Sequence, residues 1–234
     1  MNYISGGYYV VSETERPSYT NEKVVPKKLF SASGCISNFY PSLDILWNSD
    51  IEKKYVYAQT LSITKPEYEK LENWISHMSA LNLFGYPNVF VDIEYAKLFY
   101  NKWLQKTLNT KIIGIGLSKK YVDELIEVED LKSVSPEERT VIENLFLRSN
   151  PICTENQKLL GYEVLGYIKG SGEFHSYLCN GLEKEYSQHF SFKANELGLI
   201  STLEEAEKYA EFSNEEDIES EEVLWLPWGI YEYL

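Results

Sequence analysis

The residues of this chain that could carry out the most demanding chemistry are its few histidines and cysteines. His175 and Cys179 lie four positions apart, within a segment whose composition predicts a strand. On a strand they would share a face but lie about 13 Å apart, because each residue rises about 3.3 Å. We therefore do not expect a Cys–His nucleophile pair within this segment, although either residue could pair across strands. The simpler interpretation is a buried structural cysteine and a hydrogen-bonded histidine, because free cysteines mostly behave as small buried hydrophobes.

Sequence motifs for metals and phosphates are missing. None of the three histidines takes part in the His-x-x-x-His or Cys-x-x-Cys spacing that many zinc sites use. Gly114 and Gly116 are followed by Lys119 instead of a third glycine, so the dinucleotide fingerprint fails. The acidic run at 215–222 lacks the alternating ligands and the glycine of an EF-hand. We expect no cofactor, no metal and no catalytic residue that a motif would identify.

The strongest signal is the charge of the C-terminal segment. The net charge is −14, and residues 201–234 contribute −10 of it, from eleven acidic residues and Lys208. The first 200 residues hold the other 25 acidic and 21 basic residues, so they are nearly balanced. Such a negative field opposes binding to nucleic-acid phosphates and to anionic membranes. It favours a basic protein partner.

Large aromatic side chains follow the acidic run, in residues 223–234. Aromatic residues with charges around them are typical of interface hot spots. The alternative is a solvated helix face and loop followed by a strand of the core, and the sequence leaves both open. The predicted partner-binding residues are Glu211, Glu215, Glu216, Asp217, Glu219, Glu221, Glu222, Trp225, Trp228 and Tyr231.

Patterns in the first half of the chain predict an α/β unit. Strand-like composition occurs at 8–12, 28–36, 55–63, 88–93 and 111–117. Helices are predicted from a capping box at Thr64 and Glu67, over 94–108, and over 118–126. Because strands and helices alternate from 55 to 126, we expect some parallel pairing.

The second half predicts a hairpin, further helices and a last strand. A second capping box at Ser135 and Glu138 predicts another helix start. Strands at 160–168 and 172–179 flank a short turn, and helices follow at 181–189 and from 201. Pro227 cannot donate a ladder hydrogen bond, so the final strand should lie at an edge or contain a bulge.

The fold class is therefore predicted as mixed α+β. Residues 1–130 would form an N-terminal α/β region with a mixed sheet, and 131–234 a C-terminal α+β region with a final edge strand. The two regions could also form a single continuous domain. An odd number of cysteines, no signal-peptide pattern and no long apolar run predict a cytoplasmic location.

The C-terminal third, about residues 160–234, resembles immunity proteins of bacterial polymorphic-toxin and contact-dependent inhibition systems. The segments that carry the resemblance are 161–167 (GYEVLGY), 174–181 (FHSYLCNG), 195–200 (NELGLI) and 224–229 (LWLPWG). The resemblance implies a small, acidic, cytoplasmic protein without a cofactor that neutralises a cognate toxin, often a basic nuclease. These proteins are too diverse in fold for site residues to be transferred.

The first functional hypothesis is thus an immunity-like protein that binds and occludes a basic toxin domain. An alternative is a hydrolase or transferase that uses carboxylates, together with His175, in a cleft between the two regions. A third is self-association through the edge strand near Pro227. Enzymatic activity is left open, with a non-enzymatic binding protein favoured.

Overall fold

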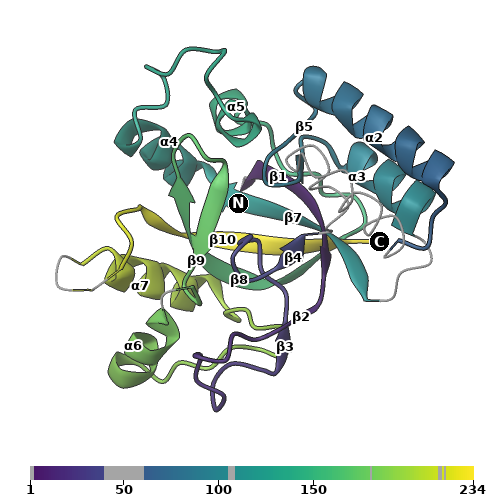
Figure 1. Ribbon diagram of the computed structural model, residues 1–234. Helices are drawn as coiled ribbons and strands as arrows, with labels where there is room; N and C mark the ends of the chain where they lie inside the picture. Colours follow the sequence, from purple (N-terminus) through teal and green to yellow (C-terminus); the bar gives the residue numbers. More distant parts are fainter. Residues whose placement is uncertain (1–2, 40–60, 105–108, 180, 216–217, 219) are drawn as a thin grey trace.

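A curved antiparallel sheet, shaped as a half-barrel, organises the chain (Figure 1). The computed structural model describes residues 3–39, 61–104, 109–179, 181–215, 218 and 220–234. The strand order is β5-β6-β1-β7-β10-β8-β9, and β4 also pairs with β1. The strands of this sheet are β1 (Tyr3–Ser12), β4 (Asn38–Phe39), β5 (Phe84–Gly85), β6 (Val89–Phe90), β7 (Thr110–Ser118), β8 (Gln157–Ile168), β9 (Glu173–Ser176) and β10 (Trp225–Tyr233). A separate two-stranded sheet joins β2 (Thr14–Glu15) to β3 (Lys28–Leu29).

The α+β class is confirmed, but the predicted parallel pairing is wrong. All strand pairs among the described residues are antiparallel. The strand expected at 88–93 is only the two-residue β6, which turns back on β5 and does not cross over to a parallel neighbour. The strand expected at 55–63 lies largely outside the described residues.

Helices cover both faces of the sheet. They are α2 (Lys65–Ala80), α3 (Ile93–Phe99), α4 (Lys119–Val128), α5 (Val141–Arg148), α6 (Leu182–His189) and α7 (Leu203–Ser213), with a π-helical turn, η2 (Tyr100–Leu104), after α3. None of the helices among the described residues is long and apolar enough to cross a membrane.

One of the two predicted capping boxes marks a helix start. The backbone N–H of Thr64 donates to the Glu67 carboxylate at the start of α2. The box at Ser135 and Glu138 forms only a turn, and α5 begins later, at Val141. There Thr140 caps the helix, and the apolar face that α5 buries follows it.

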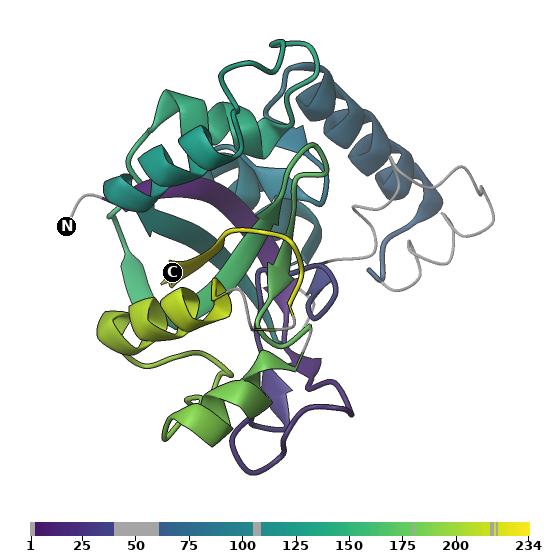
Figure 2. The same ribbon diagram turned by 90° about the vertical axis from the view of Figure 1, so that its left-hand side faces the viewer.

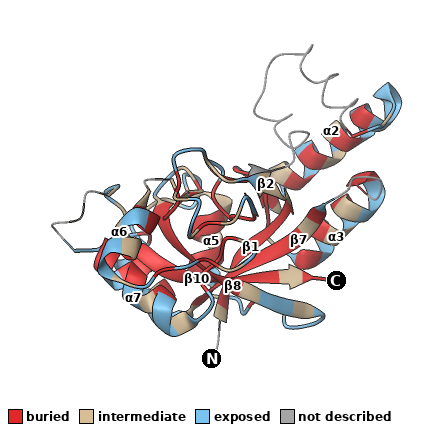
Figure 3. Ribbon diagram, turned by 90° about the horizontal axis from the view of Figure 1, so that it is seen from below, coloured by how far each residue is buried: buried red, intermediate tan, exposed pale blue. Residues whose placement is uncertain are grey.

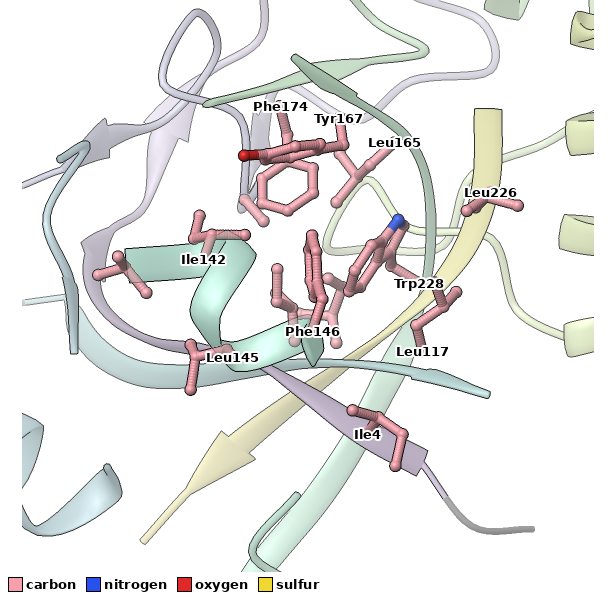
Figure 4. Close-up of a cluster of buried hydrophobic side chains, with 14 of the residues drawn as sticks. Ile4, Leu117, Ile142, Leu145, Phe146, Leu165, Tyr167, Phe174, Leu226 and Trp228 are labelled. Atoms are coloured by element: carbon pink, nitrogen blue, oxygen red, sulfur yellow. The ribbon is translucent and has the colours of Figure 1, made fainter. Parts of the chain in front are cut away.

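Side chains alternate between the two faces of the sheet along β10. Leu226, Trp228 and Ile230 enter one core cluster, which α4 and α5 cover (Figure 4). Trp225 points to the opposite face, into the cluster under α6 and α7, and Tyr231 and Tyr233 enter the cluster under α2 and α3. Because both faces are covered, nearly every residue of β10 is buried (Figure 3).

The prediction that the final strand lies at an edge is wrong. β10 runs between β7 and β8, in the middle of the sheet. Pro227 is tolerated because the pairing with β7 begins only at Gly229, so β10 has a ladder on the β8 side alone at this point. The hypothesis of self-association near Pro227 assumed an edge strand, and β10 is not one.

The two predicted regions contribute to one sheet. β7, from the first half of the chain, pairs with β10 from the second, in register from Gly116 opposite Gly229 to Ile112 opposite Tyr233. The two regions are therefore joined through paired strands.

Trp228 gives a test of this core. Its side chain is fully buried against Phe146 and Phe174, at ring-centroid distances of 5.7 and 5.2 Å. We expect Trp228→Ala to lower the free energy of unfolding by about 3–5 kcal/mol, measured by denaturant titration. Leu98→Ala, at a side chain that is 47% exposed, should change it by less than about 0.5 kcal/mol. Equal effects of the two substitutions would contradict the buried position of Trp228.

Candidate functional site

The acidic residues of the C-terminal segment lie on α7 and on the chain that leads from it into β10. Glu211, Glu215, Glu221 and Glu222 are exposed. Three others of the predicted set, Glu216, Asp217 and Glu219, lie outside the described residues. Figure 2 faces this side of the molecule, with α4 above α7.

The three aromatic residues predicted to anchor a partner are part of the core. Trp225 is 1%, Trp228 0% and Tyr231 6% exposed, so that part of the prediction is wrong. The reason is that β10 is a central strand with helices over both faces, and the sequence pattern placed it at an edge. Trp225 is held further by hydrogen bonds of its backbone N–H and C=O with the Asn214 side chain.

A hollow of about 490 Å³ lies between the end of α4 and the segment 213–224. Its acidic lining comes from Glu129, Glu215, Glu221 and Glu222. Its apolar lining comes from Val128, Ile218, Val223 and Leu224. Val128 is 60% exposed, the highest value among the large apolar side chains of α4. We call this hollow the acidic groove.

The carboxylates around the groove form no ion pair within the described part of the chain, although the Lys169 ammonium donates to the backbone carbonyl of Glu129. None of Glu129, Glu215, Glu221 and Glu222 forms an ion pair there. Lys208, the only base of the segment, lies over the Phe190 ring, 4.0 Å from its centroid. A second hollow, of about 410 Å³, is lined by Glu204, Glu205, Glu207, Lys208 and Glu211 on α7.

Tyr121 shows that the negative fields of α4 and α7 overlap. Its hydroxyl donates a 2.9 Å hydrogen bond to Glu207. Burial raises the pKa of its phenol, and the hydrogen bond to Glu207 and the charges of Glu211 and Glu124 raise it further. The acidic surface therefore extends from α7 across to α4.

A second group of reactive side chains comes from the segment before β4 and from β9 and the turn after it. The sulfur atoms of Cys35 and Cys179 and a ring nitrogen of His175 all lie within 4.8 Å of one another. We call these three residues the Cys/His cluster. The prediction that His175 and Cys179 occupy one strand is wrong, because β9 ends at Ser176 and the Cys179 N–H donates to the Ser176 carbonyl in a turn. The Asn-Gly pair at 180–181 is a turn signal that could have indicated this.

A buried carboxylate holds the two segments that carry the cluster. Glu163 on β8 is 1% exposed. It accepts hydrogen bonds from the Ser31 hydroxyl (2.6 Å), the Ala32 N–H (2.9 Å) and the Ser176 hydroxyl (2.7 Å). Ser31 and Ala32 lead into the turn of Cys35, and Ser176 leads into the turn of Cys179. Glu163 thus fixes both turns relative to β8.

Cys179 does not resemble an activated nucleophile. Burial raises the pKa of its thiol to about 11, although hydrogen bonds from Ser33 and from the Ser176 backbone lower it. A cysteine nucleophile needs a thiolate, which this environment disfavours.

Comparison with known proteins gives no match. No family model matches the chain, and neither a curated protein nor a solved structure matches it. The resemblance to immunity proteins therefore stays a prediction from the sequence.

Glu163 makes stability depend on pH in a defined direction. Burial raises the pKa of its carboxyl above the ordinary value of 4.5, with the three hydrogen bonds opposing the rise. A raised folded-state pKa contributes stability at low pH, which is lost as pH rises through the raised value. Tyr177 and Cys179, the titratable groups that face it, have raised pKa values and stay neutral in this range.

We expect Glu163→Gln to destabilise the chain near pH 4 by about 1–3 kcal/mol. The glutamine side chain has an NH2 group in place of one carboxyl oxygen, and this group cannot accept a hydrogen bond from the donors on its side. The difference from the native chain should then shrink as pH rises, by at most about 1.4 kcal/mol per pH unit. Denaturant titrations at several pH values measure it, with Glu69→Gln on the exposed face of α2 as the control. A difference that grows with pH would contradict the raised pKa.

Proposed function

We propose that this chain binds a basic protein segment in the acidic groove. The single observation that carries this proposal is a rim of carboxylates that form no ion pair among the described residues, around one exposed and three half-buried apolar side chains. Like charges around one hollow repel each other, and a cationic ligand would relieve that repulsion. The field of the surrounding α7 carboxylates would speed the encounter with a cationic partner.

The lining of the groove indicates what kind of segment fits. Val128, Ile218, Val223 and Leu224 offer apolar surface, while Glu215, Glu221 and Glu222 offer acceptors at its rim. Arginine and lysine match both, because their stems cover apolar surface and their charged ends reach the rim. Arginine also pairs with carboxylates through two parallel hydrogen bonds.

The aromatic anchors that the sequence suggested are not on this surface. Interface hot spots are enriched in Trp, Tyr and Arg, and the groove itself contributes none of these side chains. The hot-spot residues of the complex must therefore come from the partner. A basic partner that inserts arginine side chains meets this requirement.

The biological form of this activity that we favour is inhibition of a basic toxin domain by occlusion. It rests on the acidic groove and on the resemblance of the C-terminal third to immunity proteins. In this form the chain covers the nucleic-acid-binding or catalytic surface of the toxin, and it needs no reaction of its own.

The toxin domain encoded next to the gene of this chain is the probe that tests the proposal. Its association rate with the chain, measured by stopped-flow fluorescence, should fall at least about tenfold between low and high salt. The double substitution Glu221→Lys and Glu222→Lys should lower the affinity at least about tenfold, and co-expression should no longer protect cells from the toxin.

The matched control is Glu69→Lys with Glu155→Lys, which changes the net charge equally at exposed sites on α2 and in the loop before β8. It should bind as the native chain does. Equal losses in the two double variants would show that only overall charge matters, and would exclude the groove. The absence of a toxin gene beside this one would exclude the inhibitor.

A further inference from the structure

The donor atoms of the Cys/His cluster have the identity and spacing of a zinc site. Two thiol sulfurs and one imidazole nitrogen are a ligand set that Zn²⁺ uses, and its borderline softness suits both kinds of donor. In a tetrahedral site with Zn–S bonds of about 2.3 Å, two sulfurs lie roughly 3.8 Å apart. The three donors of the cluster lie within 4.8 Å of one another, so closing onto an ion requires movements of only about 1 Å.

We propose that Cys35, His175 and Cys179 bind one Zn²⁺ ion, with a fourth coordination position open to solvent. Cys35 is exposed, and His175 and Cys179 are half-buried, so the cluster opens to solvent on the Cys35 side. Three protein ligands with one open position are typical of zinc sites that hold water or a ligand from a partner. This inference is independent of the acidic groove.

Hydrogen bonds around Cys179 support a thiolate bound to a metal. The Ser176 N–H donates to its sulfur at 3.2 Å, and the Ser33 hydroxyl lies 3.4 Å from it. Donors of this kind orient a ligating sulfur and offset part of its negative charge. With a zinc ion present, they would surround the thiolate from the protein side.

His175 adds a separate observation. Its Nδ1 atom is buried and has no hydrogen-bond partner among the described residues. Buried polar atoms are rarely left unpaired, because an unmade hydrogen bond costs free energy. Zinc bound through Nδ1 would supply the missing partner, and zinc bound through the other ring nitrogen would fix the orientation of the ring.

The turns that carry the ligands are already ordered. The Cys35 N–H donates to the Ser33 hydroxyl at 3.3 Å, and the Ser33 N–H donates to the Ser31 hydroxyl at 3.0 Å. Ser31 in turn donates to Glu163, which also accepts from Ser176. The ion would thus bind to a prepared site and would link the segment before β4 to the turn after β9.

Metal titration of the full chain tests the proposal. The protein is stripped with a chelator, kept reduced with a phosphine, and titrated with Zn²⁺ against a chromophoric chelator. We expect one Zn²⁺ per chain. Cys35→Ser, Cys179→Ser and His175→Gln should each weaken binding by more than about 100-fold, since even outer-shell changes cost 10–100-fold. Cobalt substitution should give sulfur-to-metal charge-transfer bands that shrink in Cys35→Ser.

Two controls separate this result from general effects. Cys153→Ser changes the third cysteine, which packs in the cluster under α2 and α3, and should bind zinc as the native chain does. The double variant Glu221→Lys and Glu222→Lys should also keep its zinc, so a failure of the groove and a failure of the metal site can be told apart.

Cys35→Ser decides the outcome, because an exposed side chain can be changed without unfolding the protein. Zinc should raise the melting temperature of the native chain and not that of this variant. A reduced native chain that binds no zinc, or a Cys35→Ser variant that binds it equally tightly, would overturn the proposal.

Discussion

The buried carboxylate of Glu163 is the interaction on which the arrangement of the hairpin side depends. A carboxyl group taken out of water costs several kcal/mol unless hydrogen bonds replace its hydration. Here the donors come from three residues, two in the segment before β4 and one at the end of β9. Neither segment is adjacent to Glu163 in sequence, so the group can be buried only after both have reached β8. The same bonds place Cys35 and Cys179 on facing turns, and the geometry of the Cys/His cluster follows from the satisfaction of one buried group.

The pairing with β8 also explains why the aromatic residues of the C-terminal segment are buried. It pairs with β10 along nearly the whole of that strand, from Trp225 opposite Gly166 to Tyr233 opposite Gln157. Once β10 lies between β7 and β8, each of its faces is covered by helices, and Trp225 and Trp228 contribute to stability. Just before β10, Glu221 and Glu222 remain exposed. Charge and aromatic character, which lie side by side in the sequence, are therefore separated in space.

The sequence predicted the features that depend on neighbouring residues. The hairpin of β8 and β9 and the start of α2 at Thr64 both follow from local pattern. Prediction from the sequence failed where a distant segment of the chain determines the structure. Pro227 indicates an edge locally, but the place where β7 stops pairing is set by the register of another strand. Likewise no local pattern indicates that Cys35, from the other end of the chain, lies beside His175 and Cys179.

The acidic groove and the Cys/His cluster differ in chemistry, but both adjoin the same position of β8, which is a glycine. Gly166 on β8 lies opposite His175 of β9 and opposite Trp225 of β10. A Cβ atom at Gly166 would come within 2.2 Å of the Val223 side chain, which lines the groove. Val223 therefore packs directly onto the strand position that is paired with His175, one of the proposed zinc ligands. Any side chain at 166 would displace Val223 from the groove or shift β8 against β9, so this one position constrains both surfaces. A partner that presses on Val223 acts on a backbone that also positions His175.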